Sequence, residues 1–360
     1  MPQIIHSRQF IKYGIYIVFI TFFGFWLTQI DVNGLLGIIK DIDPLYILHF
    51  ATAYLLSYAL YAKKYQMLFR VIKKIKYSDL FFITCSGSYA NFIVPVSGEI
   101  LKIYALKKQE DIQVANATMV LLIERVLSLI VLLILLGIIV ICIDTPKIFK
   151  TTIIYSYMGC TALAITWVFI IQKKHRIEKF IEKLITCLPL KDNRNIRIDS
   201  SDLLKLGKKL VMAKVIGYFT LYAVLKYIFD GFRLYFVLKT IGYDLGYVEC
   251  LAANIIINFM IMIPMLPGSF GSFEFFSIWV LHYIFSVPLE VNFLEIFLAR
   301  IYSTALLFVL GVISLNHLKI STQMLKSSMF GIREASGFEL KLQPENNPGT
   351  GEKSKTGYEN

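Results

Sequence analysis

Charged residues are scarce in this chain. Asp, Glu, Lys and Arg make up 17% of its 360 residues, whereas hydrophobic residues make up 56% and the mean hydropathy is +0.63. A soluble protein of this length needs more charge on its surface, so the composition excludes an ordinary globular enzyme. It favours a protein that exposes long apolar surfaces to lipid.

Residues that ligate metals or act as nucleophiles are also few and isolated. The five histidines and five cysteines share no metal-ligand or redox spacing, and the HExxH, Gly-x-Ser-x-Gly and phosphate-loop motifs are missing. We therefore expect no metal, no cofactor and no disulfide framework. The net charge is +12, but its basic stretches lack features that read bases, so we do not expect nucleic acid as a partner.

Long apolar runs are what the sequence contains instead. A helix needs about 20 apolar residues to cross a bilayer core about 30 Å thick. Such runs occur near 11–29, 45–62, 114–142, 151–171, 211–239 and 294–316. Two further apolar stretches, 80–96 and 251–287, are broken by Pro and Gly. We predict an all-α polytopic membrane protein with its membrane domain in 1–317 and a polar, disordered tail in 318–360.

The loops set the orientation of these segments. The basic loops at 63–79 and 172–210 are expected in the cytoplasm, and the acidic or nearly neutral segments around Asp144 and Asp244–Glu249 outside. Counting crossings then requires each broken stretch to return to the side that it left, as a re-entrant hairpin or as a pair of short spans. We expect a protein of the cell membrane with both termini in the cytoplasm.

An internal repeat follows from the same count. Glu99 precedes Arg125 by 26 positions, and Glu274 precedes Arg300 by the same 26 positions. The two halves, about 1–142 and 151–317, enter the membrane from opposite faces. The sequence therefore predicts two inverted-topology repeats, a layout common in transporters.

Ionisable and helix-breaking residues at membrane depth are the candidates for a functional site. Each ionisable side chain there costs about 2.5–3.5 kcal/mol on insertion scales, so its presence needs a reason. The candidates are Asn91, Pro95, Glu99, Arg125, Lys226, Asp230, Arg233, Asn258, Pro267, Gly268, Gly271, Glu274 and Arg300. We predict that Glu99 meets Arg125 and that Glu274 meets Arg300. Such pairs either fix the packing only or line a cavity that receives a polar head group, and Glu124 is expected to be a local partner or an interfacial residue.

One apolar helix carries three of these charges. Lys226, Asp230 and Arg233 stand at i, i+4 and i+7 and share a face. Their charges either neutralise one another within the protein or leave one positive charge for an anionic ligand. In the Gly-rich segment before Glu274, a half-helix that starts near Ser272 would present its N-terminal amides to an anionic oxygen, although glycines also serve helix packing.

The order of these motifs resembles a known family. Asn91-Phe-Ile-Val-Pro95-Val-Ser-Gly98-Glu99, then Leu122-Ile-Glu124-Arg125-Val126, then Leu266-Pro267-Gly268-Ser-Phe-Gly271-Ser-Phe-Glu274 and Arg300 are similar to the membrane domain of the lysylphosphatidylglycerol synthase/flippase superfamily. The resemblance implies a flippase-like membrane module of prokaryotes. Ser269 and Phe270 stand where many relatives carry Gly and Leu. The 44 residues after Asn316 are too few for the soluble transferase domain of some relatives, so we expect the stand-alone form.

The function expected from the sequence is lipid transport rather than catalysis. We expect a lipid or lipid-linked molecule to move between leaflets through a central polar cavity, with membrane lipids, anionic phospholipids among them, as partners. A membrane-embedded transferase acting on a lipid carrier and a non-catalytic interaction subunit stay open as alternatives, and so does a homo-oligomer.

Overall fold

The computed structural model describes residues 43–93, 97–142, 212–261 and 271–320, with a few single positions between 151 and 210. The predicted segment at 11–29, nearly all of the one at 151–171, and the tail from 321 lie outside the described residues. So do the candidates Pro95, Pro267 and Gly268.

All regular structure in these ranges is helical. The helices are α3 (Pro44–Phe69), α4 (Tyr77–Ile93), α5 (Ser97–Glu110), α6 (Val114–Cys142), α10 (Ala213–Thr240), α11 (Tyr247–Met260), α12 (Ser272–Tyr283) and α13 (Leu289–His317). Four of them, α3, α6, α10 and α13, have 26 to 29 residues and are apolar enough to cross a membrane. At 1.5 Å per residue each is about 40 Å long, more than the bilayer core requires. The chain is thus an all-α, multi-pass membrane protein.

The local sequence explains where several helices begin. Asp43 caps α3 by accepting a hydrogen bond from the Leu45 amide at 2.9 Å, and Pro44 at the first helical position needs no amide partner. Helix α12 begins at Ser272, after Gly271 at φ +82°. The side chain of Glu274 reaches back and accepts from the Gly271 amide at 2.6 Å, which closes the first turn.

Two short helices lie at each broken apolar stretch. The first stretch forms α4, and α5 begins directly after it at Ser97; the second stretch contains α11 and α12. Helix α3, in contrast, continues past the predicted end at residue 62 as far as Phe69. The prediction that residues 63–69 are loop is wrong, because Lys64 and Tyr65 are buried against α6 instead of facing water.

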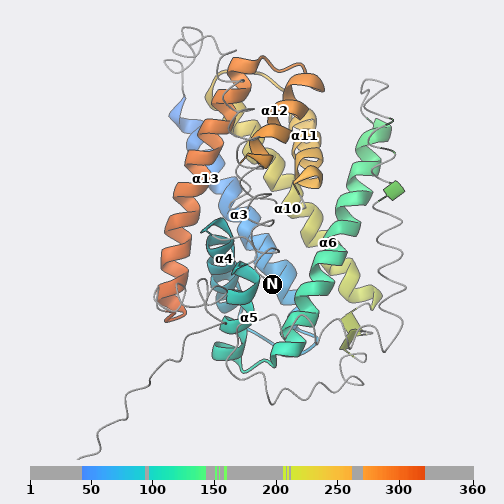
Figure 1. Cartoon of the computed structure of the whole chain (residues 1–360), viewed down its shortest axis with the longest axis vertical. Helices are drawn as coiled ribbons and strands as arrows, with labels where there is room; N and C mark the ends of the chain where they lie inside the picture. Colours follow the sequence, from blue (N-terminus) through green and yellow to red (C-terminus); the bar gives the residue numbers. More distant parts are fainter. Residues whose placement is uncertain are drawn as a thin grey trace, which may run out of the picture.

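The long helices surround the short ones. In Figure 1, α3 and α10 cross at the centre, α6 lies on one side and α13 on the other. The short helices α4 and α5 lie at one end of the molecule, and α11 and α12 lie at the other. One hydrophobic cluster, with Tyr65 and Phe69 among its largest members, fills the end near α4 and α5, and a second fills the end near α11 and α12.

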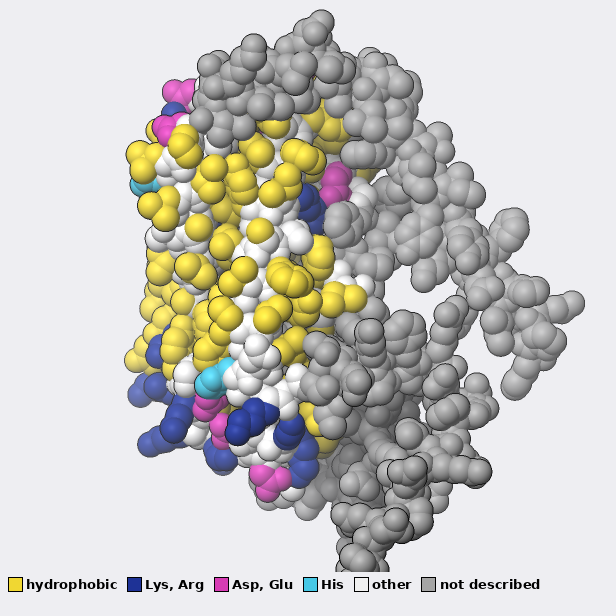
Figure 2. Space-filling view, turned by 90° about the vertical axis from the view of Figure 1, so that its left-hand side faces the viewer, with side chains coloured by type: hydrophobic (Ala, Val, Ile, Leu, Met, Phe, Trp, Pro, Cys, Tyr) yellow, Lys and Arg dark blue, Asp and Glu magenta, His cyan; other side chains and the backbone are white. Residues whose placement is uncertain are grey.

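The outer surface has the pattern of a membrane protein. Figure 2 shows a face whose middle is covered by hydrophobic side chains, while Lys and Arg side chains gather at the end of the molecule where α13 finishes. Large apolar side chains such as Ile134, Ile138 and Phe308 are more than half exposed. Exposed aliphatic side chains on several helices fit contact with lipid tails and not with water.

Candidate functional site

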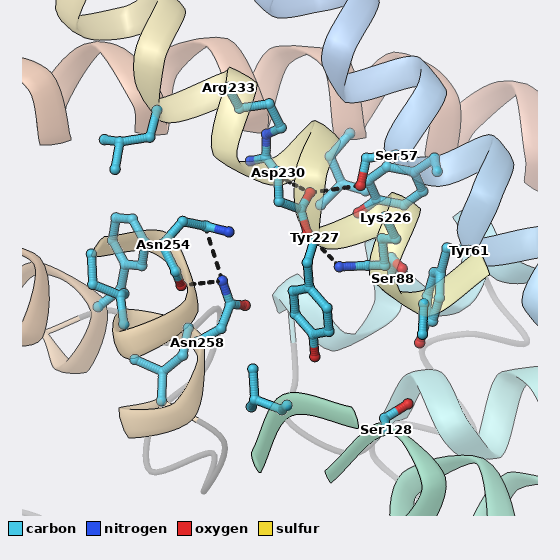
Figure 3. Close-up of a pocket in the computed structure, with 18 of the residues that line it drawn as sticks. Ser57, Tyr61, Ser88, Ser128, Lys226, Tyr227, Asp230, Arg233, Asn254 and Asn258 are labelled. Atoms are coloured by element: carbon cyan, nitrogen blue, oxygen red, sulfur yellow. Dashed lines mark hydrogen bonds and ion pairs between the residues drawn. The ribbon is translucent and has the colours of Figure 1, made fainter. Parts of the chain in front are cut away.

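A cavity of about 770 Å³ lies among the helices, at the crossing of α3 and α10. Every described helix except α5 supplies it with at least two side chains, and α5 contributes Glu99. Its polar lining consists of Ser57, Tyr58, Tyr61, Lys64, Ser88, Asn91, Glu99, Glu124, Arg125, Ser128, Lys226, Tyr227, Asp230, Arg233, Asn254, Asn258, Ser277 and Glu295. Apolar helices therefore surround a cavity with many polar and charged side chains in its wall, which Figure 3 shows in close-up.

The charged face of α10 points into this cavity. Asp230 binds Lys226 at 2.5 Å and Arg233 at 3.2 Å, and it accepts a hydrogen bond from the Ser57 hydroxyl of α3 at 2.6 Å. The prediction that the three α10 charges share one face is confirmed. Asp230 is buried, and its negative charge neutralises one of the two positive charges that it binds. The α10 face therefore keeps one positive charge.

Arg233 is held by more than its carboxylate partner. Its Nη2 donates to the Ser303 hydroxyl of α13 at 3.0 Å, and its guanidinium lies 4.7 Å from the ring centre of Tyr54. Contacts of this kind fix the guanidinium plane over an aromatic ring. The remaining positive charge of the face is thus held in one place within the cavity.

A network of charges lies at the α5 and α6 side of the cavity. Arg125 Nη2 donates to Glu99 Oε1 at 2.5 Å, which confirms the predicted pair. Glu99 also binds the buried Lys102, one turn further along α5, at 3.3 Å. Arg125 is half exposed while Glu99 is mostly covered, so this pair forms part of the wall of the cavity.

Glu124 belongs to a different pair. Lys64 of α3 binds Glu124 Oε1 at 2.6 Å, whereas Arg125 approaches Glu124 only to 3.9 Å. Of the two expectations for Glu124, a local partner of Arg125 fits this longer contact, whereas an interfacial residue is wrong, because the side chain is 2% exposed. Sequence reasoning missed the buried pair because Lys64 was assigned with its neighbours to a basic loop.

The second predicted pair is also confirmed, but it lies at the edge of the cavity. Arg300 Nε donates to Glu274 Oε1 at 2.7 Å, while the other Glu274 oxygen accepts from Gly271. The Arg300 guanidinium lies 4.6 Å from the ring centre of Phe273, which does line the cavity. Glu274 and Arg300 therefore fix the first turn of α12 onto α13 and do not line the cavity themselves.

Two asparagines among the candidates line the cavity. Asn91 accepts from the Gly98 amide at 2.7 Å and so bridges the break between α4 and α5. A Cβ atom at Gly98 would collide with the Gly87 carbonyl and the Asn91 side chain, which explains the glycine there. Asn258 donates to the backbone and side chain of Asn254 one turn earlier on α11, and Figure 3 shows both projecting from α11 toward the α10 face.

Glu295 is the lining residue that sequence reasoning missed most clearly. It lies on α13 and is 2% exposed, yet it lines the cavity, and its Oε2 has no hydrogen-bond partner within the described ranges. The signal was present in the sequence, since Glu295 is an acid inside an apolar run, five positions before Arg300. No cluster of three or more His, Cys, Asp or Glu side chains that would hold a metal ion occurs in the described part of the chain.

Comparison with known proteins identifies a family. The family model described as Lysylphosphatidylglycerol synthase TM region matches residues 9–311. No curated protein matches the chain. The family match spans all described helices except the last turns of α13, so both halves of the cavity lie inside it.

Proposed function

This chain belongs to the lysylphosphatidylglycerol synthase TM region family, and we propose that it moves a lipid or lipid-linked molecule between the two leaflets of the cell membrane. The observation that carries the proposal is the polar cavity itself. Four cationic and four acidic side chains line it, although the surrounding helices are apolar enough to span a bilayer. Ionisable groups at this depth are costly and mark the paths of polar substrates.

The two halves of the chain support an inverted repeat. Helices α4, α5 and α6 on one side, and α11, α12 and α13 on the other, each comprise two short helices followed by a long one. In each half a glutamate in the first turn of the second short helix binds an arginine of the long helix 26 positions later. The short helices lie at opposite ends in Figure 1, and α6 and α13 run in opposite directions. In our proposal the two broken segments form opposed half-channels, and both termini lie in the cytoplasm.

The charges suggest how a head group is received. In our proposal the head group enters the cavity while its acyl or isoprenoid tails stay in lipid. Arg125, half exposed at the wall, meets the phosphate first, and the α10 face with Lys226 and Arg233 then holds it. A cation in a low-dielectric cavity attracts a phosphate much more strongly than the same cation does in water. Anionic phospholipids or lipid-linked phosphates are thus the favoured substrates.

The test is leaflet exchange by the purified protein in liposomes. A lipid labelled on its head group is placed in both leaflets, and a membrane-impermeant reagent that bleaches the label reports the fraction that reaches the outer leaflet. We expect the protein to raise the exchange rate over protein-free vesicles without changing the mass of the lipid. Exchange no faster than in protein-free vesicles contradicts the proposal, and a chemically altered lipid identifies the chain as a membrane-embedded transferase instead.

A matched pair of variants ties the result to the cavity. Lys226 lines the cavity, whereas Lys214 lies on the same helix at an exposed position. Lys226→Gln is expected to slow exchange of an anionic lipid several-fold, and Lys214→Gln is expected to leave it unchanged. Equal effects of the two substitutions would mean that the lipid does not pass this face of α10.

A further inference from the structure

Three buried polar atoms at the cavity have no hydrogen-bond partner among the described residues. They are Oε2 of Glu295, Nε of Arg233 and Nδ2 of Asn254, which come from α13, α10 and α11. Buried polar atoms are normally satisfied, and those left unpaired call for an explanation. Two of these atoms are N–H donors, and the third belongs to a carboxyl that becomes a donor when it is protonated.

The surroundings of Glu295 contain few charges. The charges that act on it are those of Arg233 on α10 and Arg300 on its own helix, and Arg300 is held by Glu274 of α12. From α11 the thiol of Cys250 lies within the field of the Glu295 carboxyl, and from α3 the Tyr54 ring covers Arg233. Arg300 acts on the Glu295 carboxyl more strongly than Arg233 does, but it is bound to Glu274 and does not line the cavity. Arg233 lines the cavity, so it is the cation near Glu295 that an anion in the cavity can reach.

The Glu295 carboxyl therefore has two stable protonation states. An ionised carboxylate buried without hydrogen bonds is costly, and the group takes a proton instead unless a cation balances it. While the cavity holds no anion, the charges of Arg300 and Arg233 provide that balance. When an anion binds Arg233, the share of Arg233 is lost and a negative charge lies next to a carboxylate, so the protonated form is favoured.

The charges lining the cavity give the same result. Lys64, Arg125, Lys226 and Arg233 contribute four positive charges, and Glu99, Glu124, Asp230 and Glu295 contribute four negative charges. These eight groups sum to zero with Glu295 ionised and to one positive charge with Glu295 protonated; the buried Lys102 behind Glu99 does not line the cavity and is not counted. Uptake of one proton thus creates the charge that one phosphate diester neutralises.

We propose that Glu295 is a proton-binding site and that the cavity takes up one proton together with each phosphate-bearing head group. The proton comes from water on the side where the head group enters, resides on the Glu295 carboxyl while Arg233 and Asn254 hold the phosphate oxygens, and returns to water where the head group leaves. No covalent bond to the lipid is made or broken. The coupling rests on the proposed lipid transport, and it makes a pH gradient a source of energy for that transport.

Binding in detergent tests the coupling without relying on transport. A short-chain phosphatidylglycerol is titrated into the full-length protein between pH 6 and 9, and proton uptake is followed with a pH-indicator dye in weakly buffered solution. Because proton and anion favour each other reciprocally, uptake should rise toward one proton per lipid at alkaline pH. The lipid affinity should fall toward tenfold per pH unit over the same range. A wild-type protein that binds the lipid with no proton uptake anywhere in this range overturns the proposal.

Three variants separate this role from a structural one. Glu295→Gln mimics the neutral carboxyl, so lipid binding should persist, with no proton uptake and no pH dependence. Glu295→Asp keeps an ionisable group and should keep the linkage, whereas Glu290→Gln, at the partly exposed start of the same helix and outside the cavity lining, should behave as wild type. Proton uptake that persists in Glu295→Gln assigns the proton to another group and overturns the proposal.

Two further experiments are needed. The first distinguishes a lipid head group from a free phosphate compound as the ligand, and the second distinguishes the proton coupling from the proposed lipid transport. Proton uptake with the short-chain lipid but not with dimethyl phosphate, a diester that does not titrate in this pH range, assigns the site to a lipid head group. Uptake with both assigns it to phosphate diesters in general, and either result supports the proton site. In liposomes an imposed pH gradient should enrich a labelled anionic lipid in one leaflet with wild-type protein only. Glu295→Gln should still equilibrate the leaflets. Proton-linked binding without any exchange contradicts lipid transport alone, whereas exchange with no proton linkage contradicts the coupling alone.

Discussion

The buried pair between Lys64 and Glu124 allows a sharp test of what holds the bundle together. Both side chains are 5% exposed or less, and their charged atoms are 2.6 Å apart. The Glu124 carboxylate also accepts hydrogen bonds from Ser128 at 2.8 Å and from the Tyr65 hydroxyl at 3.1 Å. The perturbation we choose is Glu124→Gln, which keeps the shape of the side chain and removes its charge.

The structure sets the magnitude of the effect. Coulomb attraction at 2.6 Å with an effective dielectric constant of about 20 is worth about 6 kcal/mol, from which the cost of dehydrating both ions must be subtracted. Stranding the Lys64 ammonium should therefore destabilise the protein by about 3–5 kcal/mol. Lys64→Met should cost less, about 3 kcal/mol, because Glu124 keeps its two hydroxyl partners. In the double variant no charge is left stranded, so its cost should not exceed that of the costlier single variant.

The assay is reversible unfolding of the detergent-solubilised protein with increasing sodium dodecyl sulfate, analysed as a double-mutant cycle. We expect a coupling energy of about 3 kcal/mol. The pair Lys107–Asp111 is the control, because its charged atoms are also 2.6 Å apart but both side chains are more than half exposed. Its coupling should be about 0.5 kcal/mol or less. Equal coupling in the two pairs, or additivity within about 0.5 kcal/mol at Lys64 and Glu124, would refute the reasoning.

Three further predictions concern function, topology and packing. Arg233→Gln should leave the protein folded but slow exchange of an anionic lipid more than that of a zwitterionic one; equal losses in proteoliposomes, normalised to folded protein, would exclude Arg233 from the path. Cysteines placed at positions 74 and 195 should react with an impermeant maleimide only from the cytoplasm and one at 245 only from outside, and labelling of 74 and 195 from opposite faces contradicts the inverted repeat. Gly98→Ala should lower stability by about 1–3 kcal/mol, since its Cβ meets the Gly87 carbonyl and the Asn91 side chain; an unchanged midpoint of thermal unfolding would show that the α4–α5 break relaxes freely.

The sequence by itself determined the class of the protein and much of its helical layout. Bilayer thickness sets the length of an apolar helix, so the membrane spans at α6, α10 and α13 could be predicted from hydropathy alone. Helical periodicity placed Lys226, Asp230 and Arg233 on one face, because residues at i, i+4 and i+7 must share it. The pairs Glu99–Arg125 and Glu274–Arg300 were readable because both halves repeat one spacing, and a matched spacing carries information that a single charge does not.

Only the tertiary structure decided which charges meet across the bundle and which of them face the cavity. Lys64 lies 60 positions from Glu124, and nothing local distinguishes it from the basic residues that follow it in water. The Glu274–Arg300 pair looks equivalent to Glu99–Arg125 in sequence, yet Glu274 turns to cap its own helix at Gly271 while Glu99 lines the cavity. Glu295 is a candidate proton site only because α10 and α11 place Arg233 and Asn254 around the same cavity. Helix periodicity and bilayer thickness act along the chain and can be read from it, whereas burial and charge pairing between helices depend on how the helices pack.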